Sequence, residues 1–189
     1  MTGWIVLGVL VFILVGLVLY IITIYNGFVA LKNNIERNWS NIDVLLKQRY
    51  DELPKLIKVC EGYMQHEQKT LEAVIKARSM AGQARTDEQK MQAQNMLTDT
   101  LKSLFMVVER YPELKADKSF QQLGYRITEL EDQIADRREF LNESVNIYNI
   151  RIEQFPDVII ASLFNFAKRT LWQIDPEHRQ DVKVAFNHT

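Results

Sequence analysis

Residues 5–24 read IVLGVLVFILVGLVLYIITI, and this stretch decides the fold. Sixteen of its twenty residues are Val, Ile, Leu or Phe, and no charged residue occurs between positions 2 and 30. Because a helix rises about 1.5 Å per residue, a stretch of this length covers the roughly 30 Å hydrocarbon core of a bilayer. A core helix or strand of a soluble protein would be shorter and interrupted by polar positions. The stretch therefore predicts one transmembrane helix.

Aromatic residues flank the predicted span, as they do where amphipathic rings sit at the two membrane interfaces. The side chains expected to anchor the chain in the bilayer are Trp4, Ile5, Phe12, Tyr20, Ile24 and Tyr25. A cleaved secretory signal is the alternative, and it would have a basic N-terminal region, a core of about 7–15 residues and an A-x-A-like site. The N-terminal MTGW has no basic side chain, the apolar run is too long, and no A-x-A follows it. We therefore predict an uncleaved anchor.

Basic residues follow the span but do not precede it. Lys32, Arg37, Lys47 and Arg49 come after it, whereas only the α-amino group lies before it. Lys and Arg are enriched on the cytoplasmic side of membrane helices. This asymmetry predicts a single-pass protein whose C-terminal domain is cytoplasmic.

The composition of residues 25–189 indicates one helical domain, because about 165 residues suffice for a domain with its own core. A net charge of −1 gives no indication of a nucleic-acid partner, which usually requires a basic surface. The only cysteine, Cys60, has no intramolecular partner for a disulfide, and we interpret it as a small core residue rather than a nucleophile. Seven Gly and four Pro leave little room for turns and predict long helices.

Apolar positions after the span recur in steps of three and four, which describes one face of an α-helix. They are Phe28, Leu31, Ile35, Trp39, Ile42, Leu46, Tyr50, Leu53, Ile57, Cys60, Met64, Leu71 and Val74. We expect this helix to continue directly from the span and to end near residues 81–83, where Gly82 suits a helix stop. Pro54 removes a backbone donor, which predicts either a kink or a break into two helices.

Two further long helices are predicted. Thr86 and Gln89 have the T-x-x-Q form of a capping box, which starts a helix that Pro112 closes. Residues 120–155 then carry a nearly unbroken seven-residue apolar repeat, which implies neighbours packed at small angles as in a bundle. Arg137 falls on this apolar seam, and we expect it to reach solvent or to pair.

The last part of the chain leaves two alternatives open. Residues 158–172 begin apolar on nearly every face but are too short to span a bilayer. They form either a fourth core helix or a surface that lies on the membrane or on a partner. Residues 173–189 are expected to form an extended tail. The predicted architecture is all-α, with a membrane anchor over residues 1–24 followed by an elongated, antiparallel, up-and-down bundle of about four helices over residues 25–172.

Groups that would support catalysis are scarce in the sequence. His66 and Glu67 begin a pattern like H-E-x-x-H, but position 70 is Thr, so the second zinc ligand is missing. No E-x-x-H pair supports a di-iron bundle, and there is no phosphate-binding glycine-rich loop. We therefore predict no enzyme activity, no cofactor and no metal site.

Charged side chains on the first helix are candidates for contacts with a partner. Asp43 with Lys47, and Asp51 with Lys55, are spaced i, i+4, which on a solvated face stabilises a helix by only a few tenths of a kcal/mol. A partner-binding face is the alternative interpretation. The candidate partner or oligomer contacts are Asp43, Lys47, Arg49, Asp51, Phe164 and Phe166.

Several segments resemble the LemA family of bacterial membrane proteins, over most of residues 25–166. The longest and most specific is IDVLLKQRYDELPKL at residues 42–56. Shorter matching segments are Tyr25-Asn26, Leu31-Lys32-Asn33, Trp39, Gly62-Tyr63, His66-Glu67, Thr70-Leu71-Glu72, Ala77-Arg78, YPELKA at residues 111–116, Ile134-Ala135, Arg137-Arg138, Phe140, Tyr148-Asn149, Ile152-Glu153 and Phe155-Pro156. Within Phe164-Asn165-Phe166 the chain has Asn where the family usually has Gly.

The resemblance implies one N-terminal membrane helix, followed by an antiparallel bundle of about four helices, in the bacterial inner membrane. It supplies no reaction and no catalytic residue. Members of the family resemble accessory components associated with membrane proteases or envelope functions.

These features together predict a non-enzymatic, membrane-anchored helical scaffold or adaptor that self-associates or recruits partner proteins. The expected partners are membrane lipid, further copies of the chain, and a membrane protein such as a protease or envelope component, but not nucleic acid. Two alternatives remain open. One is a membrane-organising or membrane-shaping oligomer that uses residues 158–172, and the other is an accessory factor of a membrane protease.

Overall fold

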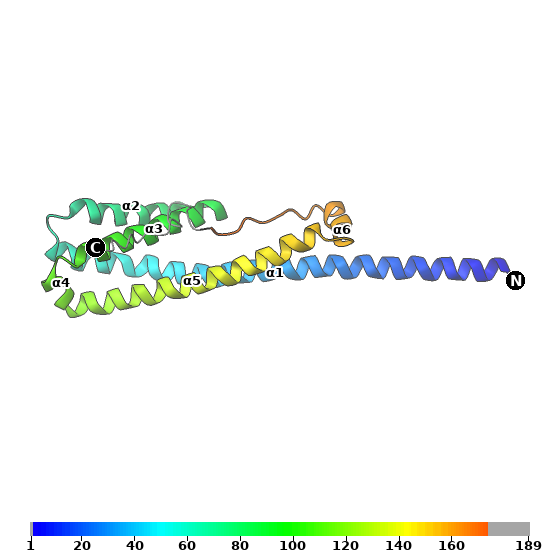
Figure 1. The fold of residues 1–189 in the computed structure, drawn as a ribbon, viewed down its shortest axis with the longest axis horizontal. Helices are drawn as coiled ribbons and strands as arrows, with labels where there is room; N and C mark the ends of the chain where they lie inside the picture. Colours follow the sequence, from blue (N-terminus) through cyan, green and yellow to red (C-terminus); the bar gives the residue numbers. More distant parts are fainter. Residues whose placement is uncertain (1, 174–189) are drawn as a thin grey trace, which may run out of the picture. The chain divides into compact units, whose positions relative to one another are not determined.

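The computed structural model describes residues 2–173, and every regular element within them is an α-helix. The six helices are α1 (Thr2–Tyr63), α2 (Gln68–Gln83), α3 (Asp87–Val108), α4 (Pro112–Ala116), α5 (Lys118–Glu153) and α6 (Asp157–Leu163) (Figure 1). The predicted all-α class is confirmed. Apart from Gln173, the tail predicted over residues 173–189 lies outside the described residues.

The described residues form two compact units. Residues 2–43 and 136–171 make up unit 1, and residues 44–135 with residues 172 and 173 make up unit 2. Helices α1 and α5 contribute residues to both units, because the division falls inside each of them.

Helix α1 joins the apolar stretch to the first amphipathic face without interruption, as expected. It also continues through Pro54, so of the two alternatives predicted at that residue, a kink or a break, the break is wrong. Leu53, Leu56 and Ile57 are buried around the exposed Pro54. Burying three such side chains at about 1.5–3 kcal/mol each outweighs the roughly 3 kcal/mol that proline costs inside a helix. The interruption comes instead at the turn over residues 64–67.

Arg78 of α2 satisfies a backbone carbonyl that Pro54 leaves without its donor. Because proline has no N–H, the carbonyl oxygen of Tyr50, four residues earlier, lacks its usual helical partner. The Nε of Arg78 donates to this oxygen at 3.0 Å, and the guanidinium carbon lies 3.8 Å from the centroid of the Tyr50 ring. Helix α2 is therefore attached to α1 at the residue whose carbonyl the proline frees.

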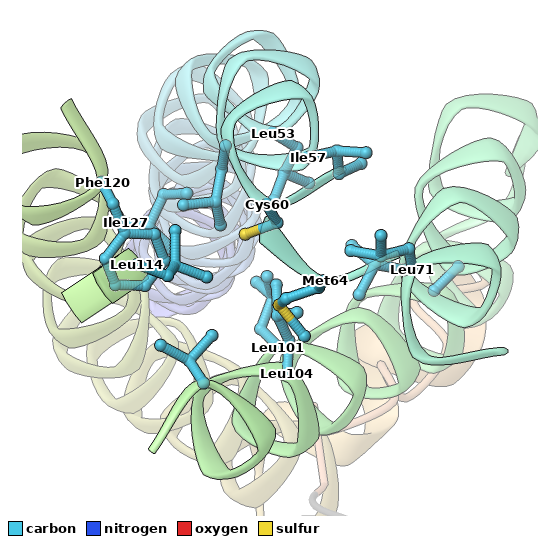
Figure 2. Close-up of a cluster of buried hydrophobic side chains, with 14 of the residues drawn as sticks. Leu53, Ile57, Cys60, Met64, Leu71, Leu101, Leu104, Leu114, Phe120 and Ile127 are labelled. Atoms are coloured by element: carbon cyan, nitrogen blue, oxygen red, sulfur yellow. The ribbon is translucent and has the colours of Figure 1, made fainter. Parts of the chain in front are cut away.

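The core of unit 2 is an apolar cluster to which α1, α2, α3, α4 and α5 all contribute (Figure 2). Its buried members are Leu53, Leu56, Ile57, Cys60, Met64, Leu71, Val74, Ala77, Leu97, Leu101, Leu104, Val108, Leu114, Phe120 and Ile127. Within this unit, the end of α1, then α2, α3 and the start of α5, alternate in direction as in an up-and-down bundle (Figure 1).

Cys60 lies inside this cluster, as interpreted from the sequence. Burial, with a smaller contribution from the charge of Glu61, raises the pKa of its thiol to about 12. Because the thiolate is the nucleophilic form, the thiol is unreactive at neutral pH.

The connection between α2 and α3 contains the predicted capping box. The N–H of Gln89 donates to Thr86 Oγ1 at 3.2 Å, and the N–H of Thr86 donates to Gln89 Oε1 at 3.4 Å. Helix α2 ends at Gln83, where a stop was expected. Pro112 does not close α3, which ends at Val108; it is the first residue of α4, where a missing N–H costs little.

Unit 1 contains the first part of α1, the second part of α5, and α6. Asn34 and Asn38 of α1 donate to the hydroxyl of Ser144 on α5 at 3.3 and 2.7 Å. Helix α5 begins and ends two residues before the predicted boundaries at 120 and 155. Arg137 reaches solvent, as expected, with its guanidinium carbon 5.9 Å from the Phe140 ring centroid.

The fourth helix predicted over residues 158–172 is wrong in its extent. Helix α6 spans only Asp157–Leu163, and residues 164–173 are not helical. The turn that ends α6 supplies the physical reason, described below with the site that it builds.

Candidate membrane-contact site

The N-terminal part of α1 is exposed around its circumference. All residues from 2 to 23 are exposed except Ile21, which is half-buried, and Ile24 and Phe28 are the first buried positions. Of the residues predicted to anchor the chain, the exposed ones are Trp4, Ile5, Phe12, Tyr20 and Tyr25. Among the described residues, α1 is the one helix that is long and apolar enough to cross a membrane.

Five aromatic rings meet where this exposed segment ends. The Tyr25 ring centroid lies 4.8 Å from that of Phe164 and 5.7 Å from that of Phe166. Phe28 stacks on Phe166 at 4.9 Å and meets Tyr148 of α5 edge-on at 6.2 Å. Each such pair adds about 0.5–1.5 kcal/mol to the effect of burial alone. This aromatic cluster holds the segment after α6 against α1, directly after the apolar stretch.

A left-handed turn at the end of α6 directs the chain into the aromatic cluster. The N–H of Phe166 donates to the carbonyl of Ala161 at 2.9 Å, and the N–H of Asn165 donates to that of Ser162 at 3.3 Å. These two bonds define a Schellman motif. Asn165 has φ 56°, a conformation that Gly adopts freely and Asn tolerates better than most residues. This explains the end of α6 and the Asn where the LemA-like pattern has Gly.

Asn149 of α5 holds the extended segment that follows this turn. Its amide nitrogen donates to the carbonyl of Arg169 at 2.8 Å, and its amide oxygen accepts from the N–H of Arg169 at 2.9 Å. Tyr148, the residue before Asn149 on α5, is also buried. Burial raises the pKa of its phenol, and the positive charge of Arg169 opposes this rise. The side-chain amide thus satisfies both backbone groups of one residue outside any helix.

Arg151 connects α5 to the start of α6 and to α1. Its Nε donates to Asp157 Oδ2 at 2.5 Å, and its guanidinium carbon lies 5.3 Å from the Phe28 ring centroid. A Cβ at Gly27 would overlap this guanidinium, so the absence of a side chain there lets Arg151 lie against α1. The arginine therefore neutralises the one charge of α6 at the position where three helices meet.

The outer surface of α6 and its flanks is apolar and exposed. Phe155 is 82% exposed, Ile159 57% and Leu163 68%, and Val158 and Phe164 are also exposed. We call these five residues the apolar tip. On the opposite face of α6, Ile160 and Ala161 are buried, so this short helix carries apolar residues on both its buried and its exposed face.

Unit 2 contains a polar cluster that the sequence analysis did not anticipate. Arg49, predicted as a partner contact, is 0% exposed and donates to Thr98 Oγ1 at 3.0 Å, to the Glu131 carboxylate and to Gln94 Oε1. The hydroxyl of Thr98 also donates to Glu131 at 2.8 Å. Within the described residues, Arg49 Nε is buried without a hydrogen-bond partner. In this structure, Arg49 contacts its own chain.

The sequence did contain a signal for this burial. Arg49 lies three residues after Leu46 and four before Leu53, both of which are buried, so it falls on the apolar face of α1.

A second buried polar contact lies on α3, where Asn95 accepts from the indole N–H of Trp172 at 3.0 Å and donates to the carbonyl of Gln173 at 2.8 Å. Trp172 is thereby fixed in unit 2 by a residue far away in the sequence.

The other charged candidates for partner contacts lie on the surface of α1. Asp43 is exposed, and Lys47 forms an exposed ion pair with Asp51. Lys55 pairs with Glu52 at 3.0 Å. The proposed role of these residues in binding a partner stays a prediction. His66 is exposed, and no group of three or more His, Cys, Asp or Glu residues suited to a metal ion occurs within residues 2–173.

The fold and this site define a class of protein: all-helical, with one helix long and apolar enough to cross a membrane and an aromatic cluster at the end of its apolar segment. The sequence model of the LemA family matches residues 38–186. The chain therefore belongs to the LemA family.

Curated relatives share low identity with the chain. Magnetosome protein MamQ 2 of Paramagnetospirillum magneticum is 24% identical over 178 residues, which cover 80% of this chain and 65% of the relative. Magnetosome protein MamQ of Magnetospirillum gryphiswaldense is 21% identical, covering 86% of this chain and 69% of the relative. Protein LemA of Metamycoplasma hominis is 25% identical, covering 82% and 71%. The chain thus spans slightly less than two thirds of the length of MamQ 2.

Proposed function

We propose that the chain is a non-enzymatic scaffold or adaptor, anchored in the bacterial inner membrane by residues 5–24, with the rest of the chain in the cytoplasm. It self-associates or recruits partner proteins there. The observation that supports this proposal is the continuity of α1, which carries the exposed apolar stretch and then the buried faces of the helical units in one helix, Thr2–Tyr63.

An exposed apolar surface of this size indicates that lipid or another protein removes it from contact with water. Sixteen Val, Ile, Leu and Phe side chains between residues 5 and 24 contribute roughly −5 to −10 kcal/mol to membrane insertion, whereas leaving them in water forfeits that free energy. Hydrocarbon covers all faces of a single helix at once. This matches an apolar segment that is exposed all round, because a partner protein would cover one face only.

The anchor is also part of the scaffold. The helix runs from the span through Tyr25 and Gly27 to the buried Phe28 without a flexible Gly/Ser-rich linker. The part of unit 1 that follows the span is therefore held at a fixed height above the membrane surface.

The test is the assembly state of the full-length protein. We expect a protein mass in mild detergent, after subtraction of the bound detergent, of at least twice the 22.2 kDa of one chain, or crosslinked products in native membranes from a photo-crosslinker placed at Lys47 or Asp51. The same crosslinker at Lys102, an exposed charged residue of α3, reports whether any product is specific to the α1 face. A monomer that gives no crosslinked product from these positions would contradict the scaffold.

A membrane-organising role is the second candidate function, and the apolar tip favours it. A chain that contacts the bilayer through both a span and the exposed Phe155, Ile159 and Leu163 would influence the lipid around it. Vesicles that keep their size and shape at high protein density would exclude this candidate and leave the scaffold unaffected.

A further inference from the structure

The apolar tip lies level with the end of the predicted span. Tyr25 directly follows residues 5–24, and its ring packs against Phe164 with centroids 4.8 Å apart. Tyr and Trp rings of membrane helices are enriched at the depth of the lipid headgroups. Phe164, the last residue of the apolar tip, is thus in direct contact with the ring that marks the membrane interface.

The chain also leaves α1 uncovered from this level towards its N-terminus. In unit 1, α6 lies beside α1 where the exposed apolar segment ends, and α1 extends beyond α6 towards its N-terminus (Figure 1). Every described position before Ile24 except Ile21 is exposed. Phe164 of the apolar tip therefore contacts α1 at Tyr25, the residue that directly follows the apolar segment.

The chemistry of the apolar tip suits the boundary between headgroups and acyl chains. Ile159 and Leu163 lie one helical turn apart on α6, Phe155 lies in the turn just before it, and each of the three is more than half exposed. The one charged residue of α6, Asp157, is neutralised by Arg151. Insertion at this boundary would remove the exposed apolar side chains of the apolar tip from contact with water.

The charges around the apolar tip are balanced. Besides the Arg151–Asp157 pair, Lys168 pairs with Glu153 at 2.5 Å and Arg169 with Glu36 at 3.4 Å. Three basic side chains thus face three acidic ones, so this region has no net attraction for anionic lipid from these pairs. Its contact with a bilayer would depend on apolar burial.

We propose that the apolar tip inserts into the interface of the leaflet from which α1 emerges and forms a second membrane contact beside the anchor. This inference rests on the anchor of the proposed function. Its occupant is lipid, because the aromatic cluster joins the apolar tip directly to the end of the span. The two contacts together fix the tilt and the rotation of unit 1 relative to the bilayer.

The test uses the full-length chain in phosphatidylcholine vesicles, with an environment-sensitive fluorophore on a cysteine introduced at Ile159 or Leu163. Cys60 is buried, with a thiol pKa of about 12, so it does not react, and the unsubstituted chain is the blank. Lipids that carry a spin label at a defined depth quench fluorophores in the bilayer. The same fluorophore at Val11→Cys measures quenching within the proposed span. Phe140→Cys is the water-exposed control, because Phe140 is an exposed residue of α5 roughly 20 Å before the C-terminal end of that helix.

We expect the fluorophores at Ile159 and Leu163 to be quenched at least about threefold more than the one at Phe140, with greatest quenching by shallow spin labels. Leu163→Asp should return the Ile159 signal to the level of Phe140, and replacing part of the lipid by phosphatidylglycerol should change quenching less than about twofold.

Quenching at Val11 together with Phe140-like signals at Ile159 and Leu163 would overturn the second contact and leave the anchor intact. An unquenched Val11 would overturn both the anchor and this inference. A blue-shifted but unquenched fluorophore at Ile159 would show that protein covers the apolar tip, and would equally overturn it. A strong dependence on anionic lipid would overturn the apolar mode of contact.

Discussion

At Asn165 one backbone conformation decides where α6 ends. The left-handed φ of 56° allows the two hydrogen bonds of the Schellman motif, which turn Phe166 back onto Tyr25 and Phe28. Without that turn, the apolar run after Leu163 could continue as a helix, as the sequence pattern alone suggests. The position therefore controls both the length of α6 and the assembly of the aromatic cluster.

Substitutions at Asn165 should change stability in opposite directions. Asn165→Gly should increase the protection of the Phe166 amide against hydrogen exchange by up to about 1 kcal/mol, and Asn165→Ala should decrease it by about 1 kcal/mol, because a Cβ disfavours the left-handed region. Asn146→Gly, in the exposed middle of α5, is the matched control and should destabilise by a few tenths of a kcal/mol. Equal effects of glycine at positions 165 and 146 would contradict this account.

The two ends of the Arg49–Glu131 pair should not be equivalent. Arg49 is 0% exposed, whereas the Glu131 side chain is 21% exposed and can recover hydration. Glu131→Leu leaves a buried guanidinium without its counter-charge and should lower the free energy of unfolding by about 2–4 kcal/mol. Arg49→Met removes the buried charge and should cost less, about 1–2 kcal/mol. Thermal unfolding of both variants in the same detergent measures the difference. A larger loss of stability in Arg49→Met than in Glu131→Leu would contradict the view that the buried arginine charge determines the cost of breaking the pair.

Elements of this chain depend on each other at their ends and interruptions. Helix α1 includes Pro54, and Arg78 of α2 donates to the carbonyl that the proline frees. Helix α5 begins at Lys118 because Asp117 accepts from the N–H of Phe120 at 2.9 Å. In both places a side chain replaces a backbone donor or acceptor that the helix itself does not supply.

Pro54 and Arg78 should therefore show coupled effects on stability. Arg78→Met should lower the free energy of unfolding by about 1–2 kcal/mol, because the Tyr50 carbonyl loses its donor and the ring loses the guanidinium. In a Pro54→Ala background the restored N–H satisfies the carbonyl, so the same substitution should cost about 1 kcal/mol less. Arg126→Met removes an ion pair with Glu129 and a hydrogen bond to Gln48 but no contact with the Tyr50 carbonyl, so it is the control and should cost the same in both backgrounds. Additive effects of Pro54→Ala and Arg78→Met would contradict the coupling.

The cap of α5 should make stability depend on pH in the acidic range. The hydrogen bond from the N–H of Phe120 lowers the pKa of Asp117 below its ordinary value of 3.8. Burial raises this pKa, and the hydrogen bond that the Tyr63 hydroxyl donates at 3.1 Å lowers it further. Because the pKa is lower in the folded state, the carboxylate stabilises the fold above pH 3.8, and this contribution is lost as the pH falls through the lowered pKa. The Tm of the natural chain should fall more steeply below about pH 4 than that of Asp117→Asn, which keeps a neutral cap. Parallel profiles would contradict the assignment.

Sequence patterns predicted the elements that local chemistry determines. The capping box at Thr86 and the apolar face of α1 depend on residues a few positions apart, and both are confirmed. The passage of α1 through Pro54 could not be predicted, because Arg78, which donates to the Tyr50 carbonyl that the proline frees, is distant in sequence. The early end of α6 depends on the conformation of a single residue. The place of Arg49 on the apolar face of α1 indicated its burial, but its partners Glu131 and Gln94 come from two other helices.

At the scale of the whole molecule, α1 carries an apolar segment long enough to cross a membrane and then residues of both helical units. The family match over residues 38–186 begins after the apolar stretch, whereas the structure shows one helix from Thr2 to Tyr63. The proposed anchor therefore depends on the exposed apolar surface of residues 2–23 rather than on the family. The proposed scaffold is this anchor together with the units that continue from it.

The most direct measurement of this claim is a scan of single cysteines from residue 3 to residue 40 in intact membranes, reacted with a water-soluble maleimide. The buried Cys60 needs no replacement. The account predicts protection of all positions from 5 to 24, and then reaction at exposed positions such as Lys32 and Glu36, with protection of the buried Phe28 and Ile35. Uniform reaction from residue 5 to residue 24 would contradict it, because that helix would then lie in water.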